Sequence, residues 1–212
     1  MSANPGVDDS IFEGLVSPAQ QGAGQLGGAL SILAKQRHDH MVMAGLLRQL
    51  GTVAAEYQDD VLRRLYRHVF SHAFAEEAVL WPVMRRVLPD GEQLTMHARR
   101  EHQEVNELVT LIESTTAGSV ARQPLLDRLV DALREDVRDE EDELLPRLQA
   151  RLGGRQLRAL GVAWATARRV APTRAHPVIS RHPPGNALAV LPLTVVDRLR
   201  DRIDRRISAL DG

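Results

Sequence analysis

The chain has no cysteine among its 212 residues, and aromatic side chains make up only 3% of them. The first absence excludes disulfides, thiolate metal sites and cysteine nucleophiles. The remaining composition is dominated by Leu, Ala, Val, Arg and Glu, which favour helix over strand. We therefore expect an all-α protein.

Strong charge and long apolar runs are also absent. The formal net charge is −1, so there is no overall basic bias toward nucleic acid. No apolar run approaches the roughly 20 residues of a membrane helix. The first ten residues, MSANPGVDDS, contain acids and no basic segment, unlike a secretory signal. These observations predict a cytoplasmic protein that binds neither nucleic acid nor membrane.

Apolar residues recur at helical spacing in five segments. They predict helices over residues 28–50, 58–88, 92–116, 122–151 and 155–169. Four long helices joined by short loops indicate an up-down-up-down four-helix bundle, and the fifth helix begins a C-terminal helical extension.

The predicted domain organisation has three parts. Residues 1–27 are rich in Gly, Gln, Ser and Pro and are expected to form a flexible arm, with a short helix near its middle. Residues 28–152 form the bundle. Residues 153–212 form the extension: a helix, a proline-rich arm over 170–193 and an amphipathic terminal helix. That last helix carries acids as well as arginines, which favours docking on the bundle or a homodimer contact over a membrane surface.

Two stretches of the predicted bundle resemble each other. Residues His72–Pro82 read HAFAEEAVLWP, and residues Asp136–Pro146 read DVRDEEDELLP. An acidic pair, a leucine and the closing proline fall in register, while His72 is replaced by Asp136. On a helix, each first residue shares a face with the first member of the acidic pair four residues later. We interpret this as a weak internal repeat of a metal-ligand pattern.

Each of the four predicted bundle helices carries such polar residues on or at the edge of its apolar stripe. Burying a charge is costly unless the charge is paired or bound to metal. Three imidazoles and three carboxylates suit iron or manganese, and zinc less exclusively. The six candidate ligands are His40, His72, Glu76, His102, Asp136 and Glu140.

Each candidate also has a simpler interpretation. A single histidine on an apolar stripe, such as His40 or His102, is commonly a core residue, and only the joint pattern favours metal. The His72/Glu76 pair could be an exposed helical hydrogen bond, and the acidic run 135–143 could be a solvated face. The remaining histidines are assigned no ligand role: His68 is expected beside the site, His38 and His97 on the surface, and His176 and His182 in the C-terminal arm.

With these residues in place, the chain resembles the hemerythrin-like, or HHE cation-binding, domains. The resemblance covers about residues 28–149. Its pieces are Asp39-His40, HAFAEEAVLWP, Glu101-His102 and EEDELLP, one from each predicted bundle helix. It implies a four-helix bundle with a non-haem di-iron centre.

The resemblance also implies roles for individual residues. The three histidines would be terminal iron ligands, and Glu76 and Glu140 would be bridging carboxylates. Their neighbours Glu77 and Glu141 would be supporting groups outside the ligands, or alternative ligands.

The chain departs from the family pattern in two places. Asp136 stands where histidine is usual, and this more electron-donating ligand should favour ferric iron. The second histidine that oxygen carriers have on the third helix is missing, because Ala98 and Asn106 occupy the positions four residues away from His102. Both departures point away from reversible oxygen transport and leave oxidase, peroxide-decomposing and sensing roles.

The leading hypothesis is therefore a protein with two non-haem iron ions that binds or reduces O2, peroxide or NO, with peroxide decomposition as a candidate enzyme activity. Mn or Zn are alternative metals. Two other hypotheses remain. One is a module that senses oxygen, iron or redox state through its metal, and the other is a metal-free helical interaction protein.

Overall fold

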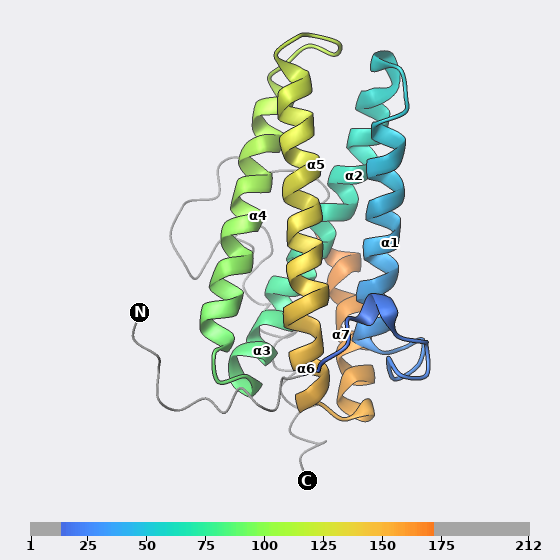
Figure 1. Cartoon of the computed structure of the whole chain (residues 1–212), viewed down its shortest axis with the longest axis vertical. Coiled ribbons are helices and arrows are strands. Elements are labelled where there is room, and N and C mark those ends of the chain that lie inside the picture. Colours follow the sequence, from blue (N-terminus) through green and yellow to red (C-terminus); the bar gives the residue numbers. More distant parts are fainter. Residues whose placement is uncertain (1–13, 172–212) are drawn as a thin grey trace.

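The computed structural model describes residues 14–171, and within this range the only regular structure is helical (Figure 1). The four long helices are α1 (Ile32–Leu50), α2 (Ala55–Ala75), α4 (Gly91–Glu113) and α5 (Arg122–Asp139). The shorter elements are the 3-10 turn η2 (Pro18–Gln20), the π-helical turns η3 (Glu76–Leu80) and η4 (Glu140–Leu144), and the helices α3 (Trp81–Val87), α6 (Leu145–Arg151) and α7 (Gly154–Val170).

The long helices form the expected bundle. Short connections fold α2 back along α1 and α5 back along α4, and Figure 1 shows these two pairs side by side. The helix α7 lies along one end of the bundle, where it packs against α1 and α2. The all-α bundle with a further C-terminal helix is thus confirmed.

Two of the predicted helices are each divided by a π-helical turn. The helices predicted over 58–88 and 122–151 each contain a proline, Pro82 or Pro146, and a proline inside a helix is expected to bend it. Instead, the irregularity lies before each proline, where the Trp81 N–H donates to the Glu76 carbonyl and the Leu145 N–H donates to the Glu140 carbonyl. Proline has no N–H to continue the helical ladder, so a wider turn closes just ahead of it. Both turns begin at a candidate ligand.

Two apolar clusters fill the interior, with the polar residues between them. On α1, Leu33 belongs to one cluster and Met43 to the other, and His40 lies between them along the helix. The same order holds on α4, where Ala98 and Val105 flank His102. The bundle therefore consists of two apolar cores separated by a polar layer.

The described part of the N-terminal segment lies against the bundle. Leu26 is fully buried, and the Gln21 side chain exchanges hydrogen bonds with Gln149 at 2.8 Å. The Ser31 hydroxyl caps α1 by accepting from the Leu33 N–H at 3.2 Å. This cap explains why α1 begins four residues later than the predicted start at residue 28.

Several expectations concern residues outside 14–171. They include most of the short helix expected near residues 11–15, most of the proline-rich arm, the terminal amphipathic helix, and His176 and His182. Within the described range, no helix has the length and apolarity needed to cross a membrane.

The α7 helix approaches the start of α1 closely at Gly161. A Cβ placed on Gly161 would lie 1.9 Å from the Leu30 carbonyl oxygen, so no larger residue fits without moving backbone. At Gly45, inside α1, the nearest atom to such a Cβ is the Arg48 guanidinium at 3.9 Å.

We therefore expect Gly161→Ala and Gly45→Ala to act in opposite directions. Helix propensity alone favours alanine by about 0.5–1 kcal/mol, which should appear as stabilisation in Gly45→Ala. Overpacking should instead destabilise Gly161→Ala by about 1–3 kcal/mol. Urea unfolding of both variants measures the two free energies, and equal stabilisation would contradict the close packing of α7.

Candidate metal centre

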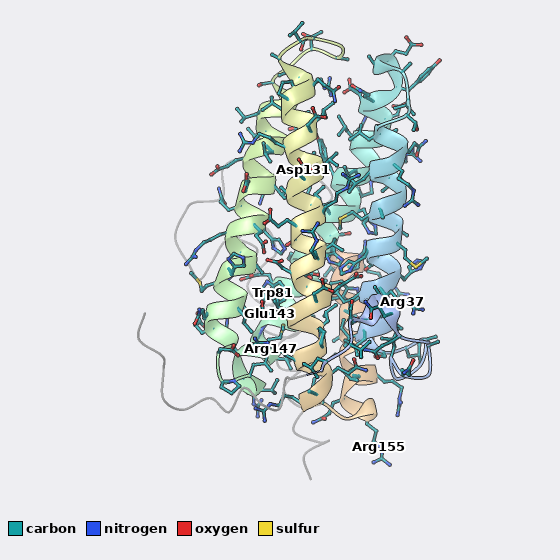
Figure 2. The ribbon with its side chains drawn as sticks, in the orientation of Figure 1. Arg37, Trp81, Asp131, Glu143, Arg147 and Arg155 are labelled. Carbon is teal, nitrogen blue, oxygen red and sulfur yellow. The ribbon has the colours of Figure 1, made fainter. Side chains whose placement is uncertain are left out.

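The structure brings all six candidate ligands together in the polar layer. Five of them are at most 4% exposed, and His102 is the most accessible, with 15% of its side chain exposed. Trp81, whose ring stacks at 6.1 Å on the His102 ring, is labelled in Figure 2 and marks this level of the bundle.

A first group of three ligand atoms comes from α1, α2 and η4. Nε2 of His40 lies 3.1 Å from Oε2 of Glu140, and Nε2 of His72 lies 3.8 Å from the same oxygen. All three ligand atoms lie within 4.8 Å of one another. Since metal–ligand bonds to N and O are about 2.0–2.2 Å, one cation can bind all three.

A second group consists of Glu76, His102 and Glu140, again within 4.8 Å. Nε2 of His102 lies 3.3 Å from Oε2 of Glu76. The other oxygen of Glu76, Oε1, lies 3.2 Å from Nε2 of His72, which belongs to the first group. Glu140 is common to both groups, and the two oxygens of Glu76 face one histidine from each group.

Asp136 lies at the edge of the second group. Its Oδ1 is 3.5 Å from Nε2 of His102. Burial raises the pKa of Asp136 well above its usual value, and Glu140 and Glu76 add to this effect against the opposing His102. The carboxyl group therefore retains a proton more readily than an ordinary aspartate.

The pKa values of the three histidine ligands are raised as well, but for a different reason. Burial disfavours their protonated forms, but the surrounding carboxylates outweigh it. Glu140 and Glu141 raise the pKa of His40 to about 9, and Asp136 and Glu76 raise the pKa of His102 to about 9. The pKa of His72 is also raised well above its usual value. In the absence of metal these imidazoles hold protons that a cation must displace.

Buried ligand atoms that make no hydrogen bond are a second reason why the cluster fits a cation. Several of its buried atoms have no hydrogen-bond partner among residues 14–171, namely Glu76 Oε2, His102 Nε2, Asp136 Oδ1 and Glu140 Oε1. Leaving buried polar atoms without partners is costly, and coordination to a metal would satisfy them. Oxygen and imidazole donors of this kind match iron, manganese or zinc.

Groups around the ligands hold them in place. Oε1 of Glu141 lies 2.7 Å from Nδ1 of His40, which leaves Nε2 facing the site. The buried Gln36 amide donates to Oε1 of Glu76 at 3.0 Å. Glu77 instead turns away and pairs with Arg99, so the two acidic pairs of the repeat are not equivalent.

A further set of partners connects His72 to α7. Oδ2 of Asp39 lies 3.6 Å from Nδ1 of His72, accepts a hydrogen bond from the Trp164 indole at 3.2 Å, and pairs with Arg168. Spacing along the chain assigns no role to Asp39, Trp164 or Arg168. The repeat and the apolar stripes contained no signal for them, because α7 lies outside the repeat and Asp39 is off the α1 stripe.

The other described histidines lie outside the ligand set. Nε2 of His68 is 2.8 Å from the Asp39 carbonyl, which places His68 beside the site, and burial with Arg168 lowers its pKa to about 4. His38 is exposed. His97 is 58% exposed and lies 3.4 Å from Asp139.

Fold and site together define a helical-bundle protein with a buried cluster of imidazoles and carboxylates arranged for cations. The model of the hemerythrin HHE cation-binding domain matches residues 31–148, and the chain belongs to this family. It is 27% identical over 153 residues to an uncharacterized hemerythrin-like protein of Schizosaccharomyces pombe, covering 72% of this chain and 73% of the relative. No solved structure matches the chain.

The raised histidine pKa values predict the pH dependence of the metal-free protein. His40 and His102 bind protons more tightly when folded than in the unfolded chain, where histidine titrates near 6.5. Their stabilising effect is complete below about pH 6.5 and disappears as the pH rises through about 9. The thermal midpoint of chelator-treated protein should fall by roughly 5–10 °C across this interval.

Metal-loaded protein provides the control. Cations and protons compete for the same atoms, so its midpoint should hold or rise over the same interval. A metal-free midpoint that does not fall between pH 6.5 and 9 would contradict the proposed proton occupancy.

Proposed function

We propose that this protein is a non-haem di-iron protein that binds or reduces O2, peroxide or NO, with peroxide decomposition as its activity. The observation that carries the proposal is the sharing of carboxylates: Glu140 belongs to both ligand groups, and the two oxygens of Glu76 face His72 and His102. One mononuclear site would not require this arrangement.

The residues divide naturally between two iron ions. His40 and His72 would bind one ion and His102 the other, with Glu76 and Glu140 between them. Bound iron would supply Lewis acidity and electron transfer. Asp136 would place an additional carboxylate beside His102, and its negative charge would favour the ferric state.

The surroundings of the ligands favour a small substrate. Glu76 is fully buried and Glu140 is 2% exposed, whereas His102 has the most exposed side chain of the six residues. A diatomic molecule or peroxide arriving from the His102 side would disturb the buried groups less than a large organic substrate would. The burial of the ligands therefore supports O2, peroxide or NO over larger molecules.

The number of metal ions tests the centre itself. We expect two irons per full-length chain after anaerobic ferrous loading, by elemental analysis. Glu76→Gln should reduce this to one or none, because an amide offers no second anionic oxygen to bridge the ions. The matched control is Glu77→Gln, which alters the Arg99 ion pair but should retain two irons. One iron in the unaltered protein would contradict the di-iron assignment.

Peroxide decomposition is tested separately. The iron-loaded protein should convert two H2O2 to two H2O and one O2, measured with an oxygen electrode. Glu140→Gln, which removes the ligand shared by both groups, should reduce the rate to that of free iron, while Glu77→Gln should retain it. A protein with two irons that leaves peroxide unchanged would contradict the peroxide activity and leave cation binding intact.

A further inference from the structure

We propose that α7 contributes to the metal centre by positioning a ligand. Trp164 and Arg168 fix the Asp39 carboxylate, and this carboxylate orients the His72 ring. This inference rests on the metal binding proposed above. It assigns positioning roles to two residues that lie beyond residues 31–148, the range that matches the family model.

Trp164, Arg168 and His72 all lie close to one oxygen atom of Asp39. Oδ2 of Asp39 accepts from the Trp164 indole at 3.2 Å, pairs with the Arg168 guanidinium, and lies 3.6 Å from Nδ1 of His72. Asp39 is 7% exposed and Trp164 is 1% exposed, so solvent provides little screening. The position of this oxygen is therefore determined from α7.

The Asp39 carboxylate also lies nearest to Nδ1 of His72, which is the outer ring nitrogen, facing away from the other ligands. Nδ1 of His72 is buried and has no hydrogen-bond partner among residues 14–171, while Nε2 faces Glu76 and Glu140. A carboxylate near the outer nitrogen of a metal-bound histidine selects the N–H form there, orients the ring and increases its donor strength. The Asp39 carboxylate is placed for this role.

The ring of Trp164 constrains His72 directly as well. The two rings meet edge to face, with centroids 5.1 Å apart and planes inclined by 83°. The Arg168 guanidinium also donates to the Ser71 hydroxyl at 2.9 Å and lies 3.3 Å from Nδ1 of His68. The helix α7 thus contacts α2 at the residue just before His72 and again one turn before it.

The two histidines of the first ligand group differ in the origin of the carboxylate near Nδ1. Nδ1 of His40 faces Glu141, which comes from η4 inside the bundle, whereas Nδ1 of His72 faces Asp39, which is held by α7. Each histidine has a carboxylate near Nδ1, but only the carboxylate beside His72 is held by α7. Changes on α7 should therefore act through Asp39 and independently of Glu141.

A double-mutant cycle on the full chain, with Co²⁺ as the probe metal, tests this coupling. Trp164→Phe retains an aromatic ring but removes the indole N–H, and Asp39→Asn retains the shape of the side chain but removes its charge. Each change should weaken Co²⁺ binding by about 10- to 100-fold in competition with a chelator. Together they should weaken it little more than Asp39→Asn alone, because both interrupt one connection.

Further variants separate positioning from packing. Trp164→Phe combined with Glu141→Gln should multiply the two separate effects on Co²⁺ binding. Arg168→Ala should weaken binding and Arg168→Lys should restore part of it, while Arg169→Ala, on the exposed side of α7, should leave it unchanged. The visible absorption bands of bound Co²⁺ should shift in Trp164→Phe, because the ligand field of His72 changes.

The outcomes distinguish a failure of the role proposed for α7 from a failure of the proposed metal centre. Unaltered protein that binds Co²⁺, with Trp164→Phe and Asp39→Asn changing only the unfolding midpoint, would overturn the role of α7 and leave the metal centre standing. Multiplying effects of these two variants would overturn it as well. Unaltered protein that binds no Co²⁺ would overturn the proposed function, and the inference with it.

Discussion

The cost of burying ionisable groups governs this protein. Three imidazoles and three carboxylates occupy the interior of the bundle, where unpaired charge is expensive. Pairing among them reduces the cost in the metal-free protein, since the carboxylates raise the histidine pKa values and His72 lowers that of Glu76 against the effect of burial. It does not remove the cost, because several of the buried ligand atoms make no hydrogen bond within residues 14–171. A pair of divalent cations would neutralise the carboxylates and satisfy these atoms together.

Much of this arrangement could be predicted from the sequence. Helical periodicity located the bundle, and the positions of His40 and His102 on apolar stripes placed them inside it. The i, i+4 spacing of His72 and Glu76 correctly put them on one face. These signals are local, and local spacing determines which side of a helix a residue occupies. The ligand roles themselves remain predictions until metal is measured.

Other features depend on contacts between distant segments. Asp39 acquires its neighbours only when α7 folds back across the bundle, and nothing in the spacing around Asp39 indicates Trp164 or Arg168. The π-helical turns were missed for a related reason, because a proline indicates a break without specifying whether the chain bends or widens. Glu77 and Glu141 likewise look equivalent along the chain but face different surroundings.

The polar layer between the two apolar cores also bears on folding. Each apolar core packs within itself, and the polar layer lies between the two cores along the helices. Without a cation, the imidazole–carboxylate pairs of this layer hold the helices together at that level, while the two cores can open with some independence. Cations bound by ligands from all four long segments would link the two cores, and cooperative unfolding of the whole bundle would then become a property of the metal as much as of the chain.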